Sequence, residues 1–456
     1  MSPMGEKGRT FGRYLGAVAA VCAAIAVGWV GTLMVSYPED PGDVLHKVAR
    51  FGALSAISVG TRVYDPAEPI QRPRAGYPAP DWQQTADAAA AFQTAHPGLA
   101  VTGVPEVPET PRTPFRFAPY DPAGAERLED YFGLAAQDAV WRTRYRALAA
   151  DDPWKAAYGK AMPDLYRLWE MNNFVNGLWA HGEIPDTIDA DGFDVVRLAE
   201  RARRDGTTSY CHAYALGLIQ IARVFGYHGR LLSLLDDGRT PRHAVAELWV
   251  PDLDRWVLFD PDFNRFYGTV DDPWDAVRIR DDYLAGNRPP TVPGRDPATV
   301  DYAERRESLA AAYRNLEWHF RDDFWVNPYF PGHPARSDFN SVIWDDTRNS
   351  PVLHLKPRTG RREAVYFPVL NWAVVPRALA DGTLETHLFA SYPGILGVTL
   401  HGSGGEVQLA EADGALAASL PLARGENRFE LVVEAGGGLT MRRRFTIAWN
   451  PEETHD

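Results

Sequence analysis

Three residues whose side chains can perform nucleophilic catalysis follow one another along the chain: Cys211, His243 32 residues later, and Asp260 17 residues after that. A thiol attacks as the thiolate, which a nearby imidazole and a helix N-terminus both favour. Cys211 opens the run CHAYALGLIQIARVFG, whose periodicity predicts a helix beginning at the thiol. Backbone N–H groups there can also face an oxyanion. The sequence therefore predicts Cys211 as nucleophile, His243 as base and Asp260 as the carboxylate that orients the imidazole.

Two predicted strands must bring His243 and Asp260 together. His243 begins the segment HAVAELWV, and Asp260 ends the segment RWVLFD, with the short turn PDLD between them. If these strands pair, the two side chains approach each other near one edge of a sheet, as in known triads. Taken singly, each residue has an ordinary structural explanation, as a buried thiol, a histidine at a strand end and an Asp-Pro turn. Their order and spacing favour catalysis.

The residues around this triad resemble the transglutaminase-like superfamily. The similar stretches are SYCHAYALGLIQIARVFGYHGRLL and HAVAELWVPDLDRWVLFDPDF, within roughly Asp194 to Phe266. The family pattern has a Cys opening a helix, an Arg after a Gly-containing turn, a His leading a strand and a Trp before Asp-Pro. The matching positions are Cys211, Arg230, His243, Trp256, Asp260 and Pro261. The resemblance implies an α+β fold with a papain-like core, in which an amide forms a Cys thioester that an amine or water then resolves.

The chain departs from the family pattern in two places. Ala244 and Val245 follow His243, where the family usually has an aromatic residue. No clear oxyanion partner precedes the nucleophile; the available side chains there are Asn172, Asn176 and Trp179. The open alternatives are a cysteine peptidase or amidase with the same triad, and a non-catalytic envelope scaffold or binding protein that uses the same fold.

Neighbouring residues are interpreted as structural. His212 is expected to point away from the nucleophile on its helix, and Trp256 is expected in the core beneath the site. The aromatic stretch from Trp318 to Phe330 is interpreted as core, with a sugar or peptide groove as the alternative. Asp281 and Asp282 lack the spacing of a metal site. Neither a cofactor nor a metal ion is predicted, because the calcium-ligand pattern of some animal family members has no counterpart here.

Charge and cysteine content restrict the class of protein. The chain has 47 basic and 60 acidic residues, a net charge of −13, which argues against nucleic-acid binding. Its two cysteines are Cys22 and Cys211, so no disulfide framework is expected. The family resemblance implies that the partner is the amide of a protein, peptide or envelope polymer.

An apolar segment near the N-terminus predicts attachment to a membrane. Residues 14–37 carry no charge and, as a helix, would extend roughly 36 Å, enough to cross a hydrocarbon core of about 30 Å. Basic residues precede the segment and acidic residues follow it, so the main body is expected outside the membrane. The alternative is a cleaved signal peptide. The Ala-, Arg- and Asp-rich composition favours a bacterial envelope.

Composition divides the chain into successive parts. A basic cytoplasmic tail at 1–13 and the anchor at 14–37 precede a Pro-rich spacer at 38–122, which has 12 prolines between Asp65 and Pro122. A short helix is expected near Asp81–Gln93. The transglutaminase-like domain, helical in its first part, is expected at 123–345. Alternating short segments at 365–450 predict an antiparallel, immunoglobulin-like β-sandwich.

Overall fold

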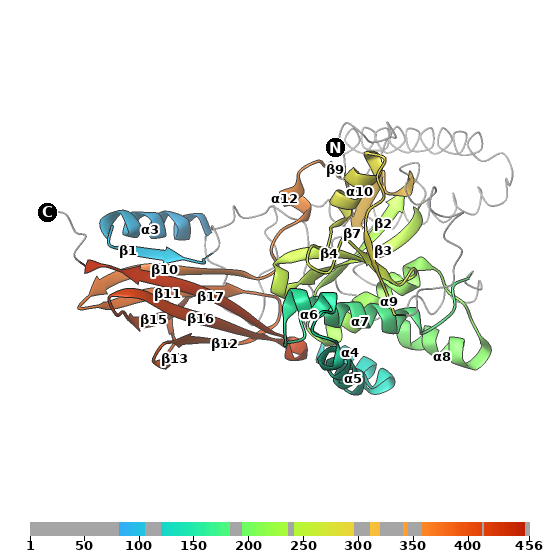
Figure 1. Cartoon of the computed structure of the whole chain (residues 1–456), viewed down its shortest axis with the longest axis horizontal. Coiled ribbons are helices and arrows are strands. Elements are labelled where there is room, and N and C mark those ends of the chain that lie inside the picture. The colour runs from blue at the N-terminus through green and yellow to red at the C-terminus, as the bar shows by residue number, and fades with distance from the viewer. Residues whose placement is uncertain are drawn as a thin grey trace, which may run out of the picture. The chain divides into compact units, whose positions relative to one another are not determined.

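The computed structural model describes residues 82–104, 120–182, 194–235, 241–295, 311–319, 341–344, 358–412 and 415–451, which form a mixed α/β fold with three β-sheets (Figure 1). The anchor predicted at 14–37 lies outside these ranges. Among the described helices, none is both long enough and apolar enough to cross a membrane.

The largest sheet has eight strands in the order β6-β5-β4-β3-β2-β7-β8-β9. The strands of this sheet are β2 (Gly229–Leu235), β3 (Pro241–Val250), β4 (Arg255–Asp260), β5 (Arg265–Tyr267), β6 (Thr291–Pro293), β7 (Asn315–His319), β8 (Ser341–Trp344) and β9 (Arg358–Thr359). All neighbours pair antiparallel except β8 and β9, which are parallel. Every residue of β2 is buried, so the centre of the sheet is covered on both faces.

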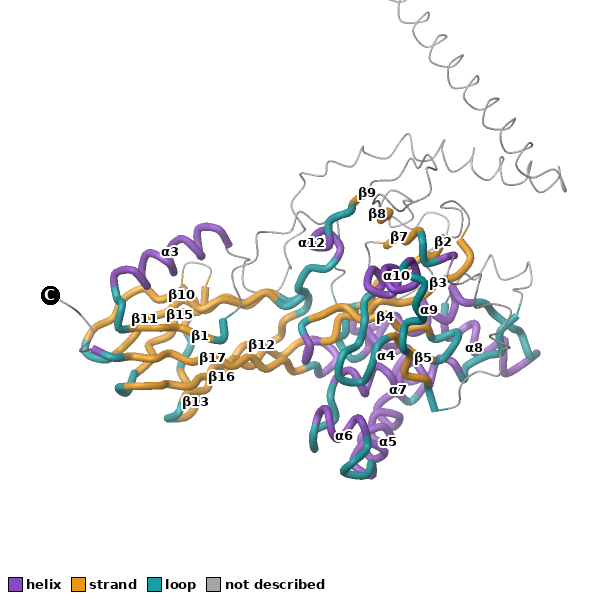
Figure 2. The backbone as a smooth tube through the Cα atoms, turned by 45° about the horizontal axis from the view of Figure 1, so that its top comes forward, coloured by secondary structure: helices purple, strands orange, loops and turns teal. Residues whose placement is uncertain are grey.

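Helix α9 (Cys211–Val224) packs against β2 and β3 on one side and against α4, α7 and α8 on the other. Its residues from Ala213 to Val224 are all buried, as expected for a helix that is apolar on every face. Figures 1 and 2 both show these helices gathered beside the sheet. The remaining helices of this part are α4 (Pro122–Phe132), α5 (Leu134–Ala147), α6 (Pro153–Tyr158), α7 (Asp164–Asn176), α8 (Val195–Asp205), α10 (Ala276–Leu284) and α12 (Arg362–Val365). Helix α9 therefore lies against the two central strands of the sheet.

Strands β3 and β4 form the hairpin that the sequence predicts. A short 3-10 turn, η2 (Pro251–Leu253), joins them, and Asp254 completes the turn with a φ of 49°. Aspartate tolerates this left-handed conformation because its short polar side chain can form local hydrogen bonds. The register runs from Val250 opposite Arg255 to Ala246 opposite Phe259. The hairpin brings the start of β3 near the end of β4.

The C-terminal strands form two antiparallel sheets, in the orders β1-β17-β16-β12-β13 and β10-β11-β15-β14. Their members are β1 (Leu99–Thr102), β10 (Asn371–Ala380), β11 (Thr383–Ser391), β12 (Ile395–Gly402), β13 (Gly405–Val407), β14 (Ala410–Ala412), β15 (Ala415–Pro421), β16 (Gly425–Ala435) and β17 (Thr440–Trp449), with the 3-10 turn η4 (Gly436–Gly438) before β17. The rings of Trp372 in β10 and Phe445 in β17 lie 6.1 Å apart, so the two sheets face each other as a sandwich (Figure 2).

The segment expected as a Pro-rich spacer, 38–122, contributes to this sandwich. Helix α3 (Trp82–Ala95), which corresponds to the helix expected near Asp81–Gln93, packs on β10. Strand β1 then pairs with β17 at the edge of the five-stranded sheet. The described part of 38–122 therefore contributes one helix and one strand to the sandwich.

Candidate active site

His243 and Asp260 are joined by a hydrogen bond between His243 Nε2 and Asp260 Oδ1 of 3.0 Å, with side chains 4% and 0% exposed. Continuing the register of the hairpin places Asp260 opposite Val245, two residues beyond His243, so both side chains lie on one face of the sheet. The backbone N–H of Phe263 donates to the same Asp260 oxygen at 3.3 Å. The carboxylate is thus held from two sides in the position that orients the imidazole.

Cys211 is the first residue of α9 and is partly exposed. Tyr210, the residue before it, is extended with φ −116° and ψ 177°. The Cys211 sulfur lies within 4.8 Å of a ring nitrogen of His243. Because Nε2 of His243 is bonded to Asp260, Nδ1 is the ring nitrogen left for the sulfur. The three residues singled out in the sequence therefore come together, at a helix start whose first N–H groups have no partner within the helix.

The charge on His243 is set by these two neighbours. Burial disfavours the imidazolium, but the Asp260 carboxylate and the hydrogen bonds to Asp260 and Cys211 outweigh it, so the pKa of His243 is raised well above its usual value. Arg265 lies on the far side of the carboxylate, with Nη2 3.6 Å from Asp260 Oδ2. A protonated His243 beside the sulfur favours a thiolate–imidazolium pair, the reactive form of a thiol nucleophile.

A second aspartate, Asp262, also faces the thiol. One carboxylate oxygen of Asp262, the sulfur of Cys211 and a ring nitrogen of His243 all lie within 4.8 Å of one another. Asp262 is 2% exposed, and its Oδ1 is 2.7 Å from His181 Nδ1. Two His–Asp pairs therefore flank one cysteine. The sequence signal for Asp262 is its place two residues after Asp260, in the turn between β4 and β5.

Backbone pairing just before the nucleophile positions His181. The N–H of Ser209 donates to Ala180 O at 3.0 Å, and the N–H of Gly182 donates to Ser209 O at 2.9 Å. A Cβ on Gly182 would lie 2.6 Å from Thr208 Oγ1, so this close approach requires glycine. Nothing local in the sequence points to His181, because its position depends on this pairing across the fold.

The upstream side chains considered as oxyanion partners take different positions. Asn176 Nδ2 donates to the carbonyls of Pro261 and Asp262, at 2.8 Å and 3.1 Å. Asn172 Nδ2 donates to the side chain of Asn264 at 3.1 Å. Both asparagines come from α7 and hold the turn that carries the two aspartates.

The third upstream side chain, Trp179, is buried. Within the described residues, its Nε1 has no hydrogen-bond partner. The indole lies in the core, with its ring centroid 5.3 Å from that of Tyr214.

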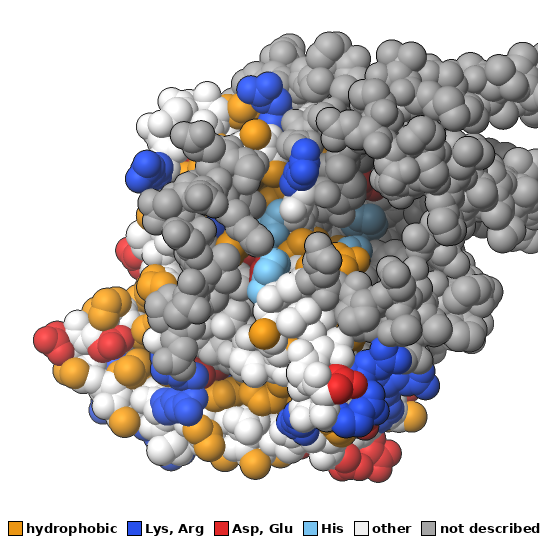
Figure 3. Space-filling view, turned by 90° about the vertical axis from the view of Figure 1, so that its right-hand side faces the viewer, with side chains coloured by type: hydrophobic (Ala, Val, Ile, Leu, Met, Phe, Trp, Pro, Cys, Tyr) orange, Lys and Arg blue, Asp and Glu red, His pale blue; other side chains and the backbone are white. Residues whose placement is uncertain are grey.

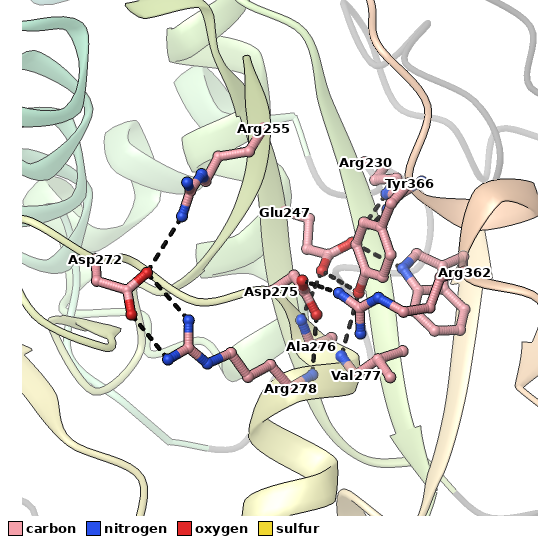
Figure 4. Close-up of polar contacts among 11 residues, drawn as sticks. Arg230, Glu247, Arg255, Asp272, Asp275, Ala276, Val277, Arg278, Arg362 and Tyr366 are labelled. Carbon is pink, nitrogen blue, oxygen red and sulfur yellow. Dashed lines mark hydrogen bonds and ion pairs between the residues drawn. The ribbon is translucent and has the colours of Figure 1, made fainter. Parts of the chain in front are cut away.

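Arg230, the arginine of the family pattern, lies in a buried ion pair and not at the thiol. Its Nη2 is 2.6 Å from Glu247 Oε2, and both side chains are 0% exposed. Trp318 Nε1 donates to the same oxygen at 2.7 Å, while Tyr366 OH and Ala276 N donate to Oε1, each at 2.9 Å. Figure 4 shows Arg230, Ala276 and Tyr366 beside Glu247. This network joins β2, β3 and β7 to α10 and to the chain after α12.

Among the described residues, those interpreted as structural are partly or fully buried. Trp256 is 2% exposed and donates from Nε1 to Phe367 O at 2.9 Å. Trp318 is buried in β7; residues 320–340, which hold the rest of the aromatic stretch, lie outside the described part. Burial, together with nearby His319, lowers the pKa of His212 to about 3, so His212 stays neutral at physiological pH.

Histidine side chains gather near the middle of one face of the molecule and are open to the surface there (Figure 3). His181 is 24% exposed at its side chain, and Cys211 is partly exposed, whereas His243 and Asp260 are buried. Cys211 therefore lies at the boundary between solvent and the buried pair formed by His243 and Asp260.

Comparison with known proteins adds little to this description. No family model matches the chain. No curated protein matches it. The crystal structure of red sea bream transglutaminase is similar over 68% of this chain and 72% of that chain, at 11% identity and a TM-score of 0.18. A likeness at this TM-score carries no information on function, so the inference of function depends on the site residues.

Proposed function

We propose that this protein is a thiol-dependent acyltransferase that acts on an amide and forms a thioester on Cys211. The observation that carries the proposal is the alignment of Asp260, His243 and Cys211: the carboxylate is hydrogen-bonded to the imidazole, and a ring nitrogen of His243 lies within 4.8 Å of the sulfur. A buried carboxylate behind the imidazole and a helix N-terminus beneath the sulfur are the two features that activate a thiol.

In the proposed first step, the Cys211 thiolate attacks the amide carbonyl carbon and forms a tetrahedral oxyanion. The backbone N–H groups at the start of α9 stabilise its negative charge. Nδ1 of His243 then donates its proton to the leaving nitrogen, the C–N bond breaks and an amine departs. Asp260 keeps the imidazole oriented through Nε2. The product is a thioester and a neutral His243.

In the second step, His243 accepts a proton from the acyl acceptor as the acceptor attacks the thioester carbonyl. The C–S bond breaks and the thiolate–imidazolium pair is restored. An amine acceptor completes transamidation, and water completes hydrolysis. We propose that the amide belongs to a protein, a peptide or an envelope polymer, and the partial exposure of Cys211 supports access of such a substrate to the sulfur.

The same proposal includes the location of the enzyme. Residues 14–37 are uncharged, with basic residues before them and acidic residues after them, which supports a single-pass anchor and a main body outside the membrane, in a bacterial envelope. Protease protection in intact cells tests this: the body should be cleaved from outside, and full protection would contradict the location.

Paired assays on the full-length protein test the chemistry. Incorporation of a fluorescent primary amine into glutamine-containing peptides reports transamidation, and ammonia release without added amine reports hydrolysis. We expect one or both in the wild type and neither in Cys211→Ala. Turnover that survives this substitution would overturn the proposal. A sulfur that no thiol-directed electrophile can reach would instead favour the non-catalytic scaffold.

A further inference from the structure

We propose that Cys211, His243 and Asp262 form a three-ligand site for a soft divalent cation such as Zn²⁺. The three side chains offer sulfur, imidazole nitrogen and carboxylate oxygen, which are the donors that zinc selects. Their ligand atoms lie within 4.8 Å of one another. Around one tetrahedral zinc ion such atoms lie about 3.3–3.7 Å apart, so a small inward rotation of the side chains closes the site.

Two of the ligands already have the supporting partners that metal ligands require. His243 donates from Nε2 to Asp260 at 3.0 Å, which leaves Nδ1 to face the cation. Asp262 is bonded through Oδ1 to His181 at 2.7 Å. Metal-bound histidines and carboxylates are characteristically held in this way by a further hydrogen-bonding group. Asp260 and His181 therefore already orient two of the three ligands.

The second carboxylate oxygen of Asp262 provides an independent argument. Asp262 is 2% exposed, and its Oδ2 has no hydrogen-bond partner among the residues that the structure describes. A buried carboxylate oxygen without a partner is unfavourable, and a bound cation would remove this cost.

Three protein ligands leave a fourth position for water or another small ligand. A cation bound there holds the same sulfur that the proposed reaction uses, so metal occupancy withholds the nucleophile from an amide. This inhibitory consequence depends on the proposed function, whereas metal binding itself does not. Zinc would therefore act as a reversible inhibitor of the enzyme.

Cobalt(II) spectroscopy on the full-length Cys22→Ser protein, in which Cys211 is the remaining cysteine, tests the site. We expect one Co²⁺ per chain, with a thiolate-to-cobalt charge-transfer band and intense tetrahedral d–d bands, and displacement by one equivalent of Zn²⁺. Alkylation of Cys211 blocks the thiol without an amino-acid substitution, and it should abolish the bands. Persistence of the bands after alkylation would overturn the proposal.

Variants identify the other ligands. Asp262→Asn should weaken Zn²⁺ binding at least about tenfold, and His181→Gln should weaken it by about 10–100-fold, as loss of a supporting group does. Asp151→Asn, at an exposed aspartate between α5 and α6, is the matched control and should bind as the wild type does. Unchanged affinity in a folded Asp262→Asn variant would contradict the assignment.

The two proposals fail separately. Chelator-treated protein without amide turnover, but with cobalt binding as expected, would refute the proposed function and leave the metal site. Turnover in chelator together with no cobalt binding would refute the metal site and leave the function.

Discussion

Replacing Asp260 by asparagine tests how far the reactivity of Cys211 depends on the charge behind His243. The two charged atoms lie 3.0 Å apart, and Coulomb's law with an effective dielectric constant of about 20 gives an attraction of about 5.5 kcal/mol. Each charge is spread over more than one atom, so we expect about half of this energy to be lost in Asp260→Asn. The pKa of His243 should therefore fall, and the thiolate–imidazolium population should fall about a hundredfold at a given pH.

The assay is the rate of alkylation of Cys211 between about pH 5 and pH 8, where histidine charge changes normally occur. The full-length Cys22→Ser protein serves as background, and Asp151→Asn serves as the matched control. At the acidic end of this range, Asp260→Asn should react roughly a hundredfold more slowly, and the difference should shrink as the pH rises. A folded Asp260→Asn protein with the wild-type rate at every pH would refute the reasoning.

Other expected outcomes concern the nucleophile and the stability of the fold. Cys211→Ala should keep the wild-type circular dichroism and melting temperature but lose all amide turnover; loss of folding would show that the thiol is structural. Glu247→Gln leaves Arg230 buried without its counter-charge and should lower the unfolding free energy by about 3–5 kcal/mol in urea titrations, and an unchanged midpoint would contradict this. Burial, with Asp252 nearby, raises the pKa of Asp164 to about 7, so folding favours its protonated form. This stabilisation is complete below about pH 4 and is lost as the pH rises through about 7, so Asp164→Asn should flatten that decline in melting temperature, and identical pH profiles would contradict the assignment.

The parts of the site that the sequence predicts depend on short-range patterns. Alternation in the segments around His243 and Asp260 and the short turn between them define a local hairpin, and its pairing places the two side chains together. The helix that begins at Cys211 is likewise predicted by the apolar periodicity of the residues that follow it. The mixed α/β character and the sandwich strands follow from similar local signals.

The remaining parts depend on contacts between distant segments. His181 reaches the site because the chain at Ala180 pairs with Ser209, and no local pattern encodes that pairing. Strand β1 joins the sandwich by pairing Leu99 with Trp449 at the other end of the chain, although it lies in a Pro-rich segment. The family pattern singled out Arg230 without showing its role, which burial against Glu247 makes structural.

The covalent state of Cys211 during turnover tests the central claim most directly. Intact-mass spectrometry of the full-length protein, incubated with an amide substrate without added amine, should reveal an acyl adduct. The adduct should map to Cys211, disappear on treatment with hydroxylamine and be absent in Cys211→Ala. Amide turnover that proceeds with no adduct on Cys211, and at an equal rate in Cys211→Ala, would contradict the account.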